Sequence, residues 1–352
     1  MIANLQLLRA LAAMLVVLFH AREIAPDVAE YPLFRGGMCG VDIFFVLSGF
    51  VMVYTTERPD QARRFLLRRM LRVAPPYYLI VLVAALLWML SPGLFRSTVI
   101  DPESLTKTLA FVPYVKSDAR IYPILFVGWT LNYEMFFYAV FAVAMLVSHR
   151  YRAMVAGIAI AVLTLGELAV SGLEYGPVAY VLTRSIMLDF VLGMAVGRGH
   201  GAIVRLAGRT GGWPFGLLFA AGAGLLALAA TADWPAAAIV PDTSGFFRFG
   251  LFAAMMVAGV VGLDAAGHRI RNRLALQVGD ASYALYLLHP FVVILGVKVA
   301  DRLDLSLPTR LGVIVAAMAI ATGLAILFHR RVERPMVAAL NRWFVPRPQA
   351  AA

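Results

Sequence analysis

Long apolar segments alternate with short polar loops along the whole chain. A helix needs about 20 mostly apolar residues to cross the hydrocarbon core of a bilayer, and a window of that length finds ten candidates. The pattern predicts an all-α polytopic membrane protein with about ten transmembrane helices. The candidates lie near residues 2–21, 38–55, 74–92, 122–147, 153–171, 177–197, 213–232, 245–263, 276–298 and 309–328.

The composition supports a membrane protein. Hydrophobic residues make up 61% of the 352 residues and charged residues 14%, whereas a soluble domain is about half apolar and a quarter charged. The net charge of +11 could suggest a nucleic-acid-binding protein, but the arginines are spread between apolar segments instead of gathering on one soluble domain. The single cysteine, Cys39, excludes an intramolecular disulfide.

The charges in the loops predict the orientation of the chain. One set of alternate loops holds most of the arginines and the other set holds most of the acids. Since loops rich in Lys and Arg stay in the cytoplasm, we expect both termini there. Residues 1–335 then form one transmembrane domain and 336–352 a cytoplasmic tail. The longest loop, 93–121, is expected outside, as a connector or as a lid over the external mouth.

The first apolar segment carries two side chains that lipid tolerates poorly. Arg9 and His20 are eleven residues apart, close to three helical turns, so they share a face and lie about 16 Å apart along the axis. Ionisable residues inside a membrane are costly and mark functional sites by default. The alternative is that Arg9 reaches the lipid headgroups and His20 caps the helix end.

A second cluster of charge lies in "RRFLLRRMLRVAPPYY", residues 63–78. Arg64, Arg68 and Arg72 follow each other at intervals of four, and Arg69 precedes Arg72 by three residues, so they line one side of a helix. Arginine pairs bind phosphates in a bidentate way that lysine cannot. The same cluster could instead anchor the chain to lipid headgroups.

Acids and histidines inside the predicted spans are few. Asp42, Glu134, Glu167 and Asp189 could each form a structural ion pair, but Glu134 lies mid-segment among aromatic residues and is the hardest to explain in that way. Asp42 is near a span end and could cap a helix. In "GDASYALYLLHP", residues 279–290, Tyr286 and His289 share a helix face, and Pro290 should kink the helix and free a backbone carbonyl.

These motifs together resemble the acyltransferase-3 family of integral membrane acyltransferases, and most of all its exopolysaccharide acetyltransferase branch. The resemblance rests on "LRALAAMLVVLFH", "GVDIFFVLSGF", "RRMLRVAPPYY", "WTLNYEMFFY", "SYALYLLHP" and a final "ERP". It implies a ten-helix enzyme of the bacterial inner membrane that moves an acyl group, typically acetyl, from cytoplasmic acyl-CoA to a sugar hydroxyl of a polysaccharide or its lipid-linked precursor. No metal is implied, and nucleic acid is not an expected partner.

The resemblance and the residue patterns give a set of expected roles. The family's first-helix Arg and His match Arg9 and His20, its RxxR motif matches Arg69 to Arg72, and its fourth-span acid matches Glu134. We expect His20 to act as general base, with Glu134 or Asp42 orienting its ring. The donor should be held by Arg9, Arg68, Arg69 and Arg72, and the substrate by Tyr133, Tyr286 and His289. A transporter or flippase of lipid-linked sugars is the alternative; a polysaccharide polymerase would need larger external loops.

Overall fold

The computed structural model describes residues 2–57, 61–91, 100–116, 120–166, 175–231 and 246–345. Over these ranges the regular elements are helices, and one isolated β-bridge joins Val115 and Ile121. The predicted all-α, multi-pass architecture is therefore confirmed. The long helices are α1 (Asn4–Ala21), α3 (Cys39–Thr55), α4 (Ala62–Leu90), α6 (Trp129–Val147), α11 (Trp213–Thr231), α12 (Leu251–Ala265), α14 (Ser282–Arg302) and α15 (Leu307–Phe328).

Most of the predicted spans are found in the part of the chain that the structure describes. Eight helices of the described residues are long and apolar enough to cross a membrane, and a bent pair raises the number to nine. The predicted span 153–171 is represented by α7 (Arg152–Leu165), which has only 14 residues, and Glu167 lies outside the described residues. The predicted span 177–197 is the bent pair, in which α8 (Gly176–Leu182) meets α9 (Leu188–Arg198) through a short 3₁₀ turn at 46°.

The break in this sixth segment has a local cause. The Arg184 Nε donates to the Tyr180 carbonyl at 2.9 Å, the acceptor that the Arg184 backbone N–H would use in a continuing helix, and that N–H donates to the Val181 carbonyl instead. The chain then leaves the helix at Arg184, whose ψ is 138°. Hydropathy does not report such side-chain hydrogen bonds.

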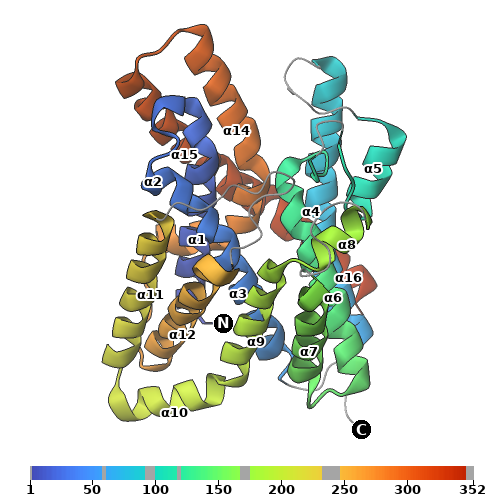
Figure 1. Cartoon of the computed structure of the whole chain (residues 1–352), viewed down its shortest axis with the longest axis vertical. Coiled ribbons are helices and arrows are strands. Elements are labelled where there is room, and N and C mark those ends of the chain that lie inside the picture. The colour runs from blue at the N-terminus through green and yellow to red at the C-terminus, as the bar shows by residue number, and fades with distance from the viewer. Residues whose placement is uncertain are drawn as a thin grey trace.

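Helix α1 lies inside the bundle, where it contacts α3, α12, α14, α15 and the short helix α13 (Arg273–Asp280) (Figure 1).

Helices α3 and α9 pack closely because glycines leave no side chains between them. A Cβ on Gly49 would lie 2.1 Å from the Phe190 carbonyl oxygen, and one on Gly193 would lie 2.0 Å from that of Val46. Small residues permit this approach between membrane helices.

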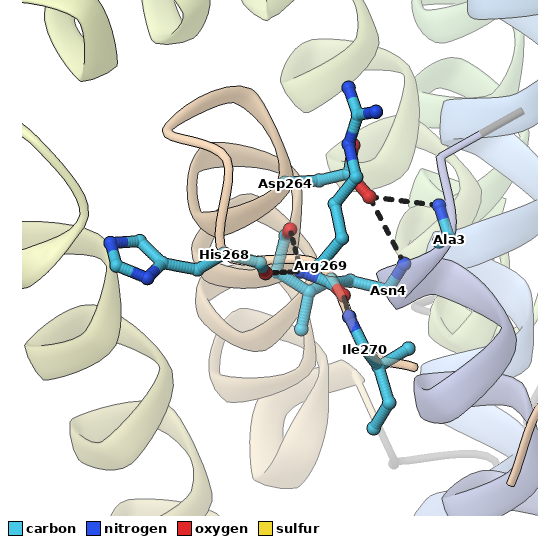
Figure 2. A network of polar contacts seen from close by, with 7 residues as sticks. Ala3, Asn4, Asp264, His268, Arg269 and Ile270 are labelled. Carbon is cyan, nitrogen blue, oxygen red and sulfur yellow. Dashed lines mark hydrogen bonds and ion pairs between the residues drawn. The ribbon is translucent and has the colours of Figure 1, made fainter. Parts of the chain in front are cut away.

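The start of α1 is fixed by a polar network with the end of α12 (Figure 2). The Asp264 carboxylate accepts from the backbone N–H of Ala3 and Asn4, at 2.8 and 3.3 Å, and pairs with Arg269. The Asn4 side chain donates to the His268 carbonyl at 2.8 Å and accepts from the Ile270 N–H at 2.8 Å. The N-terminal turn of α1, and with it the position of Arg9, is thereby set.

Short amphipathic helices accompany the long ones. Helix α10 (His200–Thr210) runs across the ends of α9 and α11 (Figure 1), and α16 (Arg334–Phe344) continues from α15 through a π-helical turn. At the end of α16 the exposed apolar side chains of Trp343 and Phe344 follow Arg342, a combination typical of a helix at the membrane interface. The predicted domain boundary at 335 falls inside α16 and stays a prediction. Further short helices are α2 (Pro32–Arg35) and α5 (Pro102–Leu109).

Candidate functional site

A pocket with apolar walls and several charged side chains lies between α1, α3, α4, α6 and α14. It encloses about 890 Å³ of empty space, part of it open to solvent. Three guanidinium groups and one carboxylate line it, so its walls carry a net positive charge that suits an anionic ligand. The polar lining residues are Arg9, Ser48, Arg69, Arg72, Thr130, Glu134, Tyr138, Ser282, Tyr283 and Tyr286.

The arginines reach the pocket from two helices. Arg69 and Arg72 are one turn apart on α4, and the Arg69 Nη2 donates to the Thr55 hydroxyl at 2.9 Å while its guanidinium lies 5.8 Å from the centre of the Phe65 ring. Arg9 projects from α1 and donates to the Gln6 side chain at 3.3 Å. Because neither contact is a salt bridge, these two guanidinium groups keep much of their capacity to bind an anion.

Glu134 is held in place by two hydroxyl groups. The Ser48 hydroxyl on α3 donates to its carboxylate at 3.3 Å, and the Tyr138 hydroxyl, one turn later on α6, donates to the same oxygen. The charge of Glu134 acts on both Arg9 and Arg69. The carboxylate therefore balances part of the positive charge of the pocket instead of contacting a histidine.

Tyr286 of α14 lines the pocket and is held by two hydrogen-bond partners. Its hydroxyl donates to the Val127 carbonyl at 2.6 Å and lies 2.7 Å from the Thr130 hydroxyl, so α14 is tied to the start of α6. Its ring centre is 6.1 Å from that of His289. Tyr286 thus lines the arginine pocket and lies next to His289.

Two histidines stack behind Tyr286. The rings of His20 on α1 and His289 on α14 have their centres 5.2 Å apart and an interplanar angle of 29°. His20 is partly exposed and also contacts the edge of the Phe126 ring, at 4.9 Å between centres. His289 is completely buried, and its Nδ1 lies 3.1 Å from the Leu285 carbonyl oxygen.

The structure brings together some of the predicted site residues and separates others. Arg9, Arg69, Arg72, Glu134 and Tyr286 line one pocket, whereas His20 and His289 form a pair beside it. Arg68 and Tyr133 do not line the pocket. The Tyr133 ring packs between Phe45 and Trp129, at 6.0 and 5.8 Å between ring centres.

The expected carboxylate partner of His20 is placed elsewhere. Asp42 is buried, and its carboxyl interacts with that of Asp189 where α3 packs on α9. Glu134 faces the arginines. Among the described residues, no carboxylate contacts the His20 or His289 ring. The expectation that Glu134 or Asp42 orients His20 therefore does not match this geometry, because the ring against His20 is that of His289.

Several pocket residues were not singled out from the sequence. Tyr138 could have been found from its position four residues after Glu134, and Ser48 lies in the same apolar motif as Asp42. Thr130 and Tyr283 carry no distinguishing signal of their own. Over the described residues, no group of three or more His, Cys, Asp or Glu side chains is arranged to hold a metal ion.

Fold and site together define a multi-pass membrane protein with a basic pocket inside its helical bundle and a histidine pair next to it. The chain belongs to the acyltransferase-3 family, because the model of that acyltransferase domain matches residues 2–330. The conclusion agrees with the resemblance of the sequence motifs.

Individual relatives support the same family. The chain is 33% identical over 327 residues to the exopolysaccharide production protein ExoZ of Rhizobium meliloti (strain 1021), covering 91% of this chain and 94% of that protein. It is 26% identical to the acyltransferase MdmB of Streptomyces mycarofaciens, covering 90% and 84%. A shorter match of 32% identity joins 22% of the chain to 12% of the peptidoglycan O-acetyltransferase OatA of Listeria monocytogenes serovar 1/2a (strain ATCC BAA-679 / EGD-e). No solved structure matches the chain.

Proposed function

We propose that this membrane acyltransferase moves an acyl group, in the first place acetyl, from cytoplasmic acyl-CoA to a sugar hydroxyl of an exported polysaccharide or its lipid-linked precursor. The observation that carries the proposal is the arginine pocket lined by Tyr286, with the His20–His289 pair next to that tyrosine. The names of the relatives ExoZ and OatA support a polysaccharide acceptor. The proposal places the protein in the bacterial inner membrane, with both termini on the cytoplasmic side.

The donor is expected to bind through its phosphates. Arg9, Arg69 and Arg72 offer planar donors that bind phosphate oxygens in pairs. The extended thiol arm of the donor would then pass Tyr286 and bring its thioester near His20. Since Arg9 and His20 both belong to α1, the helical rise sets their axial separation at about 16 Å.

The transfer step uses His20 as general base. His20 takes the proton of the acceptor hydroxyl while the hydroxyl oxygen attacks the thioester carbonyl carbon. The new C–O bond forms, the C–S bond breaks, and the departing thiolate receives the proton from His20, so that free CoA and the ester are produced. General-base assistance of this kind contributes about 10²–10⁴-fold to a rate.

Purified protein in liposomes with radiolabelled acetyl-CoA tests the activity. Label in the glycan acceptor, lost in His20→Ala, supports the proposal. Sugar translocation without transfer of label would instead favour a flippase.

A donor-binding test uses matched arginines of α4. Arg69→Ala with Arg72→Ala should raise the KM for acyl-CoA by roughly tenfold or more, since each lost charge-assisted hydrogen bond is worth about 1.5–3 kcal/mol. Arg68→Ala is the control, because Arg68 does not line the pocket. An equal KM in both variants would indicate that Arg69 and Arg72 anchor the chain to lipid headgroups and do not bind the donor.

A further inference from the structure

The buried histidine of α14 has its two ring nitrogens in different environments. The Nδ1 of His289 lies 3.1 Å from the Leu285 carbonyl oxygen, and a carbonyl can only accept a hydrogen bond, so Nδ1 must carry the proton. In the neutral ring, Nε2 then has a free lone pair. This Nε2 is buried and has no hydrogen-bond partner in the structure.

Pro290 contributes to this arrangement. In a helix the carbonyl of Tyr286 would accept from the backbone N–H four residues later, but residue 290 is a proline and has none. The freed Tyr286 carbonyl acts on the His289 ring together with that of Leu285. Two backbone acceptors therefore favour a protonated Nδ1.

A buried acceptor without a donor costs free energy and calls for an explanation. The His20 ring is the neighbour that can supply the donor. Its centre is 5.2 Å from that of His289, and an N–H···N bond of about 3 Å between two facing ring edges also places the ring centres about 5 Å apart. Rotation of His20 about χ2, which is a broad torsion, could replace the stack by this hydrogen bond without movement of α1 or α14.

We infer that His289 is the positioning residue of His20: its Nε2 accepts a hydrogen bond from one nitrogen of His20 and leaves the other nitrogen free to take the acceptor proton. The inference rests on the proposed function. His289 then fills the role that a carboxylate has in hydrolase triads, where a third group orients the base and stabilises its charged form. The proton itself returns from His20 to the departing thiolate, so His289 neither gains nor loses one over the cycle.

Two substitutions separate this role from a structural one. In His289→Asn the amide nitrogen can replace Nδ1 and keep the bond to Leu285, but nothing replaces Nε2. In His289→Gln the longer side chain brings an amide oxygen close to the position of Nε2 and restores an acceptor. We expect His289→Asn to lower kcat by about 100-fold with the KM for acyl-CoA within about twofold of wild type, and His289→Gln to recover at least about tenfold.

The assay is acetyl transfer by the full chain in liposomes, with thermal unfolding of each variant as the measure of folding. Wild-type kcat in His289→Asn overturns the inference, and so does a His289→Gln variant no better than His289→Asn. If His289→Asn does not fold, His289→Gln decides alone: kcat within about tenfold of wild type supports the role, and a lower value overturns it. Failure of the wild-type chain to transfer acetyl would instead refute the proposed function.

Discussion

The contact between α3 and α9 makes a sharp prediction for Gly193→Ala. The added Cβ would lie 2.0 Å from the Val46 carbonyl oxygen and 2.8 Å from the Phe50 nitrogen. Both are backbone atoms of α3, so no side chain can rotate away. Close carbon–oxygen contacts between helices are normally about 3.3–3.6 Å, and the two helices must therefore separate by about 1.3 Å.

The cost follows from the packing that this separation removes. A gap of 0.5–1 Å already loses about a quarter to a half of the dispersion energy of the atoms that face it. Overpacking in well-packed interiors costs about 1–3 kcal/mol, and we expect Gly193→Ala to lower the free energy of unfolding by at least this amount. Asp42 and Asp189 lie at the same interface, so their mutual contact should loosen as well.

Unfolding of the purified protein by heat or by a denaturing detergent measures the effect. Gly323→Ala is the matched control, because a Cβ at Gly323 of α15 meets nothing within 4 Å. Alanine is favoured over glycine in a helix interior by about 0.5–1 kcal/mol, so the control should be neutral or slightly stabilising. Equal stability of the two variants would refute the close packing of α3 on α9.

Three further predictions concern polar contacts. Asn4→Ala should lower the free energy of unfolding by about 1–3 kcal/mol, seen as a lower melting temperature, because it removes the hydrogen bonds to the His268 carbonyl and from the Ile270 N–H, each worth about 0.5–1.5 kcal/mol. Arg310→Lys should lower the free energy of unfolding by about 1–3 kcal/mol, since one ammonium cannot replace the bonds of the Arg310 guanidinium to three carbonyls and to Asp301. An unchanged melting temperature would contradict this. In Asp101, the hydrogen bond from the Ser104 N–H is the main cause that holds the pKa of the carboxyl below its usual value. Its stabilisation of α5 is complete above the unfolded pKa and is lost as pH falls through the folded pKa, so the protection factors of the α5 amides against hydrogen exchange should fall in acid and depend less on pH in Asp101→Asn.

Hydropathy located most of the helices because the requirement for apolar length is strict in a bilayer. Hydropathy does not show where a span bends. The segment at 177–197 is apolar enough for one span, yet the Arg184 side chain takes the Tyr180 carbonyl and the chain bends there by 46°. This bend therefore could not be read from composition.

The site was predictable residue by residue but not as an arrangement. Helical periodicity placed Arg69 and Arg72 on one side of a helix, and the cost of burying charge singled out Arg9 and Glu134. Tertiary packing decides which helices face each other, and a single sequence carries no direct signal of that packing. For this reason the pairing of Asp42 with Asp189, and of His20 with His289, could not be foreseen.

The position of Tyr286 has a consequence for the proposed reaction. A thioester in contact with water and a general base would be hydrolysed, so donor and base must be kept apart until an acceptor is present. Tyr286 lines the arginine pocket and lies next to His289, with its hydroxyl bound to the Val127 carbonyl and the Thr130 hydroxyl. On the proposed path the thiol arm passes this ring. A Tyr286→Ala variant should therefore release CoA from acyl-CoA without acceptor several-fold faster than wild type, as measured with a thiol reagent, whereas an unchanged rate would mean that this ring does not separate the two compartments.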